Sequence, residues 1–139
     1  MTTLKKQINE YNQILGSLKP KQWEIEVVPK RNVRDIIAHM VGWEKEAVEQ
    51  LKKPKDDSYS MGIKDYQKFN DIAVRRYKIL STKELMNEWE KWQKLLDEEI
   101  IKSDRETLDK KSQLFDWIID GKESNHYECH LIQLRKLFN

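Results

Sequence analysis

The sequence predicts an all-α protein, a four-helix bundle with up-down-down-up topology and an extra short helix in the long crossover. Four segments of roughly 15–20 residues carry apolar side chains at every third or fourth position, as helices with one buried face do. Gly and Pro total only 4 and 3 of the 139 residues, which is too few turn-formers for a β-sandwich or barrel. The long segment between the second and third main helices can cross the bundle, so these two helices can run in the same direction. We expect one domain over residues 1–139.

The first helix is predicted over residues 3–18, and Pro20 follows it closely. Its apolar residues form one stripe, made of Leu4, Ile8, Tyr11, Leu15 and Leu18. The next stretch, residues 21–31, is apolar but short and bounded by proline. We interpret it as an extended packed connection, because a short strand there has no obvious partner.

The second helix is predicted over residues 33–53, between an Asn32 cap and Pro54. The Asn32 side chain can accept hydrogen bonds from free backbone N–H groups, and the Asp35 carboxylate suits the positive end of the helix. Its apolar residues form a wide stripe that we expect to be buried. Gly42 lies mid-helix, where it costs about 1 kcal/mol relative to Ala, and we interpret it as a point of close approach to a neighbouring segment.

The remaining elements follow from the same signals. Ser81 and Glu84 form a Ser-x-x-Glu capping box directly ahead of an apolar periodic run, which begins the third main helix. In chain order, we expect a polar loop over 54–62, the short crossover helix over 63–80, the third main helix over 82–103, a polar loop over 104–113, a compact apolar block over 114–119 and the last helix over 123–138.

Composition excludes several classes of protein. The 26 basic and 24 acidic residues give a formal net charge of +2, which is too small a field to indicate binding to nucleic acid or an anionic membrane. No stretch approaches the roughly 20 apolar residues of a membrane span, and the first residues lack the apolar core of a signal peptide. The single cysteine excludes an internal disulfide and a Cys-rich zinc motif. We therefore expect a cytoplasmic protein.

The three histidines are the strongest functional signal. His126 and His130 are four residues apart in the predicted last helix, and four residues advance about 6 Å and turn about 400°, so both imidazoles leave one face. Two histidines need this geometry to bind one metal ion. His39 lies at the flank of the buried stripe of the second helix, and a bundle can bring it against the last helix. Three neutral imidazoles with an open fourth position are typical of a catalytic metal site. The alternative is that each histidine is an ordinary partly buried or surface residue.

The carboxylates near these histidines are interpreted as structural. Glu128 points about 200° away from His126 around the helix, so we expect it to be solvated or bonded to a neighbouring loop. Asp35 lies one turn before His39 and can serve as its outer partner, but a place at the start of a helix explains it equally well. Glu44 is interpreted in the same way, and no residue stands out as a general base.

Two further residues lie beside the histidines in the sequence. Cys129 precedes His130 and is an alternative fourth ligand, but helix geometry cannot aim both at one ion, so we interpret it as a small buried or half-exposed residue. Trp43 lies one turn beyond His39 and is interpreted as core packing, with the wall of a metal-side pocket as the alternative.

Several runs of the sequence resemble one known superfamily. Val33-Arg-Asp-Ile-Ile-Ala-His-Met-Val-Gly-Trp-Glu44 resembles the second-helix signature of DinB/YfiT-like proteins, and His126-Tyr-Glu-Cys-His130 resembles the histidine pair on their last helix. Phe69-Asn70 and Ser81-Thr-Lys-Glu-Leu85 resemble their middle region, so the resemblance covers most of the chain in order. Cys129 departs from the pattern, because relatives commonly carry Glu there.

The resemblance implies a bundle with up-down-down-up topology and a divalent metal ion, often nickel or zinc, held by His39, His126 and His130. It also implies a metal-dependent hydrolase, or a thiol-dependent transferase or isomerase that uses a small thiol cofactor, acting on a small-molecule substrate. Many members are dimers, and apolar residues exposed on the first and last helices leave a homodimer open here. Imidazole alone does not choose among zinc, nickel, iron and copper.

Two other functions stay open. A non-catalytic helical binding or stress-response module would use its histidines structurally. The neighbouring ClbS/DfsB-like branch shares the second-helix run but commonly lacks the full histidine triad, and it implies a protective hydrolase that acts without metal. The complete triad of this chain favours the metal-binding branch.

Overall fold

A computed structural model describes residues 3–53, 66–104, 106 and 126–138 of the chain. The predicted loop over 54–62, most of the loop over 104–113 and the apolar block over 114–119 lie outside the described residues. The described elements are α1 (Thr3–Gly16), the 3-10 helix η1 (Pro20–Glu24), β1 (Glu26–Val28), β2 (Arg31–Asn32), α2 (Val33–Lys52), α3 (Tyr66–Tyr77), α4 (Thr82–Lys102) and α7 (His126–Phe138).

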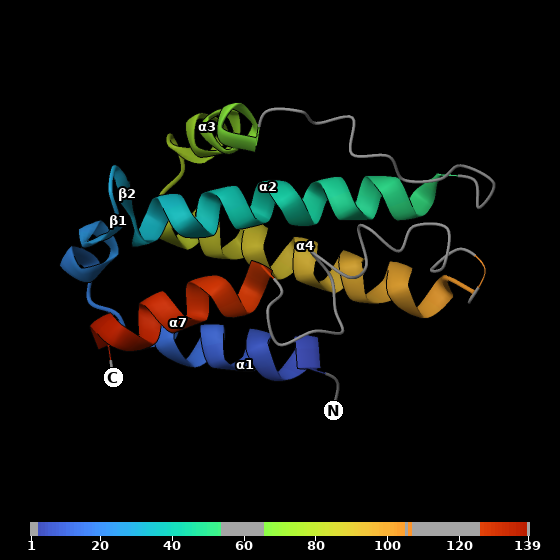
Figure 1. Cartoon of the computed structure of the whole chain (residues 1–139), viewed down its shortest axis with the longest axis horizontal. Helices are drawn as coiled ribbons and strands as arrows, with labels where there is room; N and C mark the ends of the chain where they lie inside the picture. The colour runs from blue at the N-terminus through green and yellow to red at the C-terminus, as the bar shows by residue number, and fades with distance from the viewer. Residues whose placement is uncertain (1–2, 54–65, 105, 107–125, 139) are drawn as a thin grey trace.

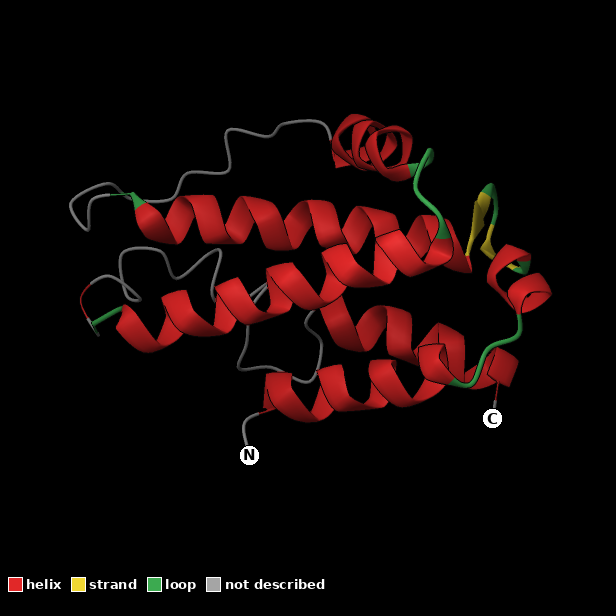
Figure 2. Ribbon diagram, turned by 180° about the vertical axis from the view of Figure 1, so that it is seen from behind, coloured by secondary structure: helices red, strands yellow, loops and turns green. Residues whose placement is uncertain are grey.

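Four long helices form the bundle, and their directions match the prediction. Figure 1 shows α1 and α7 running one way and α2 and α4 running the other, so the topology is up-down-down-up. The close pairs are α2 with α4 and α1 with α7, while α3 lies outside the bundle against α2. The same arrangement is visible from behind in Figure 2, where the only described strands form a small hairpin at one end. The predicted all-α bundle with a short helix in the crossover is confirmed.

Both predicted helix starts are confirmed by reciprocal hydrogen bonds. The Asp35 backbone N–H donates to Asn32 Oδ1 at 2.8 Å, and the Asn32 N–H donates to Asp35 Oδ2 at 3.1 Å. Ser81 and Glu84 make the equivalent pair at the start of α4, at 3.1 Å and 3.0 Å. Each box satisfies N–H groups that the helix itself leaves unpaired. The structural interpretation of Asp35 therefore accounts for its side chain.

The expectation for residues 21–31 is wrong in two respects: Pro20–Glu24 form a 3-10 helix instead of an extended segment, and the strand that follows does find a partner. β1 pairs antiparallel with β2, and Val28 lies opposite Arg31. The turn between them places Lys30 in the left-handed region, with φ 68°. Such turns normally carry Gly or Asn at this position, and the absence of either residue hid the hairpin from the sequence pattern. The hairpin brings Lys30 and Arg31 to the start of α2.

The crossover helix α3 is held against α2 by a close approach and by a basic side chain. A Cβ atom added at Gly42 would lie 2.7 Å from Ala73 Cβ, so the prediction of close approach at this glycine is confirmed. Arg34 of α2 donates through Nη2 to the carbonyl oxygens of Tyr77 and Leu80. These carbonyls belong to the end of α3 and the turn after it, and the contacts satisfy acceptors that a helix terminus leaves open.

The core lies among the four long helices and is rich in aromatic residues. Its largest fully buried side chains are Trp43, Trp89, Tyr11, Tyr127, Ile36, Ile37, Met40, Leu85 and Leu96. Four of these nine belong to α2, more than to any other helix, and α2 contacts more elements than any other described helix. Residues of α2 are thus the most firmly positioned in the molecule.

Candidate metal centre

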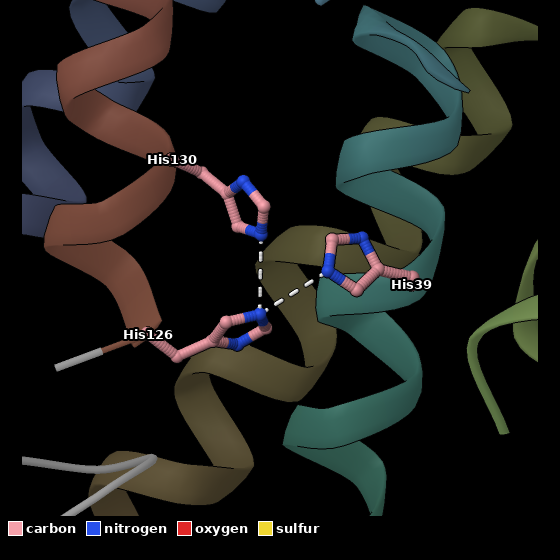
Figure 3. A group of neighbouring side chains, drawn as sticks. All are labelled: His39, His126 and His130. Atoms are coloured by element: carbon pink, nitrogen blue, oxygen red, sulfur yellow. Dashed lines mark hydrogen bonds between the residues drawn. The ribbon is translucent and has the colours of Figure 1, made fainter. Parts of the chain in front are cut away.

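Three histidines from two helices converge at one end of the bundle interior. His39 comes from the second turn of α2, and His126 and His130 come from the first and second turns of α7. Their Nε2 atoms face one another in Figure 3. The His126 Nε2 atom lies 3.2 Å from His39 Nε2 and 3.2 Å from His130 Nε2. We call His39, His126 and His130 the histidine cluster; its three ligand atoms all lie within 4.8 Å of one another.

Two of the three nitrogen separations in the histidine cluster match those around a tetrahedral metal ion, and the third is within 4.8 Å. Zinc–imidazole bonds of about 2.0–2.1 Å place neighbouring ligand nitrogens about 3.3 Å apart at the tetrahedral angle. The observed separations from His126 are 3.2 Å. The rings meet edge to face, with interplanar angles of 73–88°, so nitrogen edges converge instead of ring faces stacking.

Hydrogen bonding alone does not satisfy this arrangement. A ring nitrogen of a neutral imidazole either carries one proton or offers one lone pair. The Nε2 atom of His126 is shared by both close contacts, so it cannot form a linear hydrogen bond to each neighbour. A cation at the centre would accept a lone pair from all three nitrogens at once, and the donor set is one that divalent transition metals favour.

The protein holds these imidazoles in the neutral form that binds metal. Burial lowers the pKa of His39 to about 3, aided by the positive charges that His130 and Arg31 can carry and opposed by the backbone carbonyls of Asp35 and Ile36. Burial likewise lowers the pKa of His126 and of His130. Neutral rings keep their lone pairs available, because protons compete less with the metal.

Outer contacts orient one ring and leave a second one open. The His130 Nδ1 atom lies 2.7 Å from Gln133 Oε1, and this oxygen accepts the Nδ1 proton, which leaves Nε2 with its lone pair. The Nδ1 atom of His39 is buried and has no hydrogen bond of normal geometry within the described part of the chain, although the Asp35 and Ile36 carbonyls are near enough to favour its protonation. Gln133 is therefore the clearest outer partner of the cluster.

The histidine cluster opens onto a cleft of about 480 Å³. The β-hairpin and α3 form its other walls, with side chains from Pro29, Lys30, Arg31, Gln67, Asn70 and Asp71 among those that line it. This volume falls within the range of small-molecule sites. His39 is buried, while His126 and His130 are partly exposed toward this space.

The other residues singled out near the histidines lie outside the cluster. Glu128 is 22% exposed and is bonded to helices instead of a loop: it accepts from Arg135 Nη1 at 2.7 Å on its own helix and from Gln7 Nε2 at 3.3 Å on α1. Cys129 is exposed and is absent from the cluster, so the search of the described residues does not support it as a fourth ligand. Trp43 is buried in the core, and its Nε1 donates to Asn70 Oδ1 at 2.9 Å, which fixes a residue of the cleft wall.

Glu44 has a role that sequence reasoning missed. It is only 1% exposed, and the Tyr127 hydroxyl donates to its Oε2 at 3.0 Å. Burial raises the pKa of Glu44 well above its ordinary value, although the Tyr127 hydrogen bond acts in the opposite direction. The Tyr11 hydroxyl in turn donates to the Tyr127 carbonyl oxygen. We call Glu44, Tyr127 and Tyr11 the tyrosine–glutamate cluster.

A signal for Glu44 was present in the sequence. The core face of α2 repeats at alternating steps of four and three residues, through Ile37, Val41, Glu44, Val48 and Leu51. A carboxylate inside such a repeat is buried if the helix is, and it then needs a hydrogen-bond partner.

In comparisons with known proteins, the chain matches no family model, no curated protein and no solved structure. None of the helices in the described ranges is long and apolar enough to cross a membrane.

Proposed function

We propose that this protein is a metal-dependent enzyme of the DinB/YfiT-like type, a hydrolase or a thiol-dependent transferase acting on a small molecule. Its histidine cluster would hold one divalent ion, with nickel and zinc as the leading candidates. The observation that carries the proposal is the convergence of three Nε2 atoms, two of them 3.2 Å from the third, beside a cleft of about 480 Å³.

Each part of the site has a role in this proposal. A divalent ion bound here would lower the pKa of a coordinated water or thiol and so supply a nucleophile at neutral pH. The three imidazoles fill one side of the coordination sphere, and the remaining side faces the cleft. Gln133 holds His130 in the tautomer that leaves Nε2 free.

Proton transfer is not assigned to a side chain. The cluster of described residues contains three histidines and no carboxylate, unlike the His-Glu-x-x-His helix of zinc proteases. The nearby Glu44 carboxyl is engaged by Tyr127 in the core, and Asp71 of the cleft wall is paired with Arg31. We therefore propose no general base.

Metal content tests the site directly. The protein is stripped with a chelator, dialysed against excess nickel or zinc and then against buffer, and analysed for metal per chain. We expect about one ion per chain for the wild type and background metal for His126→Ala and His130→Ala. Glu128→Gln is the matched control, because it changes α7 on the face toward α1 and should retain the ion.

Turnover tests the enzymatic part. Metal-loaded protein is assayed with an aryl ester and with a small thiol plus an aromatic electrophile, before and after chelation. We expect turnover in at least one assay that is lost with the metal and in the histidine variants. Wild-type protein that binds no more metal than His126→Ala would overturn the metal site. Metal binding without turnover would instead favour a binding module.

A further inference from the structure

Two cationic residues that are adjacent in the sequence line the cleft together with the histidine cluster. Lys30 and Arg31 both line the cleft, at the turn of the hairpin and the start of β2. Lys30 is held at φ 68°, a backbone conformation that an L residue with a side chain rarely adopts. Its N–H donates to Glu26 Oε1 at 3.1 Å, which supports the strained turn. Non-glycine residues held in this way are concentrated at functional sites.

The Arg31 guanidinium is positioned between the hairpin and α3. Its side chain is only 22% exposed, and its Nη2 atom pairs with Asp71 Oδ1. Arg31 lines the same cleft as the three histidines, so one molecule in the cleft can lie beside both the guanidinium and the histidine cluster. A guanidinium has five N–H donors in a planar fork, and a single carboxylate oxygen does not use them all.

The charge of the cleft follows from its lining residues. Two cationic residues, Lys30 and Arg31, line the cleft together with one acidic residue, Asp71, and no other acidic residue of the described chain is among those that line it. This leaves the cleft with an excess of one positive charge before any metal binds. A wall built for a neutral or cationic ligand would not place two cations beside a metal site.

We propose that Lys30 and Arg31 form a subsite for an anionic group of the substrate, a carboxylate or a phosphate, while another polar atom of the same molecule lies at the histidine cluster. This inference rests on the proposed function and names its substrate class: small organic anions. The fork of Arg31 would receive the anion, and Lys30 at the rim would add a second charge-assisted contact.

The apolar part of the cleft limits the shape of such a substrate. Val28, Pro29 and Ile36 also line it. These side chains suit a short hydrocarbon segment between the anionic group and the reacting group. The site therefore fits a small bifunctional molecule better than a polymer or a compact inorganic ion.

Binding of one molecule to the subsite and the histidine cluster together is tested on cobalt-loaded protein, because cobalt–thiolate complexes absorb visible light. The protein is titrated with 3-mercaptopropionate and with 3-mercapto-1-propanol, which have similar lengths but differ in charge. We expect the anion to bind about tenfold more tightly than the alcohol. Arg31→Gln and Lys30→Gly should each reduce that preference several-fold while metal content stays unchanged. Lys30→Gly also relaxes the strained turn, so it is expected to fold.

Lys136→Gln is the matched control, since it removes one positive charge from the exposed end of α7, away from the cleft. It should leave the preference intact. An equal preference in the wild type, Arg31→Gln and Lys30→Gly would overturn the subsite while leaving the metal site standing.

A metal-free arm separates the two proposals. Amide chemical shifts of the unloaded protein are followed by NMR during titration with propionate, inorganic phosphate and 1-propanol. We expect saturable shifts of the Lys30 and Arg31 amides with propionate, with phosphate or with both, and none with 1-propanol. The anion that binds more tightly shows whether the subsite prefers a carboxylate or a phosphate. If the wild type shows these shifts but binds no metal in the metal-content assay, the metal site is overturned and the subsite stands. The same shifts in Arg31→Gln, or none in the wild type, would overturn the subsite.

Discussion

Two buried polar clusters join α2 to α7, and they are built from residues that are close in sequence. The histidine cluster contains His39 and His126, while the tyrosine–glutamate cluster contains Glu44 and Tyr127, the residue directly after His126. In the tyrosine–glutamate cluster each hydroxyl donates to an oxygen, although Glu44 Oε1 has no hydrogen-bond partner within the described part of the chain. In the histidine cluster three ring nitrogens converge on one point, and no single proton arrangement satisfies them all.

The difference separates two reasons for burying polar groups. Hydroxyl-to-oxygen hydrogen bonds between helices hold them in one register, which is a structural role. Ring nitrogens whose lone pairs converge on one point are typical of a site that binds a metal ion. The two clusters also differ in access, since Glu44 and Tyr127 are 1% exposed whereas His126 and His130 are partly exposed beside a cleft.

The strongest test of this contrast is the thermal effect of added metal. Zinc or nickel at about 1,000 times its dissociation constant should stabilise the folded wild type by about 4 kcal/mol, because the ion binds only the folded site. This corresponds to a rise in Tm on the order of 10 °C for a domain of this size. We expect the rise to vanish in His39→Ala and to persist in Tyr127→Phe. A rise of equal size in both variants would contradict the division between the clusters.

Removing the Tyr127 hydroxyl should lower the stability of the metal-free protein and leave metal binding intact. Tyr127→Phe should lower the free energy of unfolding by about 1–3 kcal/mol, since Glu44 loses its hydrogen-bond donor in the core. Urea denaturation of the metal-free protein measures this loss. An unchanged midpoint would show that the tyrosine–glutamate cluster does not stabilise the fold.

The outer partner of the histidine cluster should affect metal affinity more than stability. Gln133→Ala removes the acceptor for His130 Nδ1 and should weaken metal binding by about 10–100-fold. The metal-free Tm should change little, because Gln133 is only half-buried. Competition with a chromophoric chelator measures the affinity, and Ile132→Ala on the exposed neighbouring position is the control.

The smallest expected effect is a pH dependence at Glu44. Its pKa is raised on folding, so the folded state keeps a proton that the unfolded chain loses above about 4.5. Stability therefore falls as pH rises, by up to about 1.4 kcal/mol per pH unit, until pH reaches the folded pKa. The cluster histidines have lowered pKa values, so their opposite effect ends above their ordinary value of 6.5.

Urea denaturation of the wild type and Glu44→Gln between about pH 5 and pH 9 isolates the contribution of Glu44, because both proteins carry the same histidines. Glu44→Gln keeps an oxygen acceptor for Tyr127 but has no titrating proton, so its stability should decline less steeply with pH than that of the wild type. Parallel curves for the two proteins would refute a raised pKa for Glu44.

Local signals in the sequence were enough to predict much of the fold. Asn32 and Ser81 begin helices as predicted, and Gly42 marks a close helix contact, because capping and close approach depend on a few neighbouring atoms. The spacing of His126 and His130 predicted that both would leave one face of α7. The place of His39 at the flank of the buried stripe, together with the family resemblance, predicted that it would join the pair, and the structure brings it there.

The features that escaped prediction depend on contacts between distant segments or on unusual backbone. The hairpin was missed because Lys30 occupies a position that normally signals its turn with Gly or Asn. Glu128 was assigned to solvent or a loop, since nothing local indicates its contacts with Gln7 and Arg135 across the α1–α7 interface. Glu44 was missed because its partner, Tyr127, lies 83 positions away in the chain.

Helix α3 lines the cleft but contributes no residue to the histidine cluster. The imidazoles come from α2 and α7 inside the bundle, whereas Gln67, Asn70 and Asp71 reach the cleft from a helix packed outside it. Substitutions in α3 can therefore change the shape and charge of the cleft wall without moving the three imidazoles. One peripheral helix would then be enough to change which molecules fit the cleft, while the proposed metal site keeps its donor set.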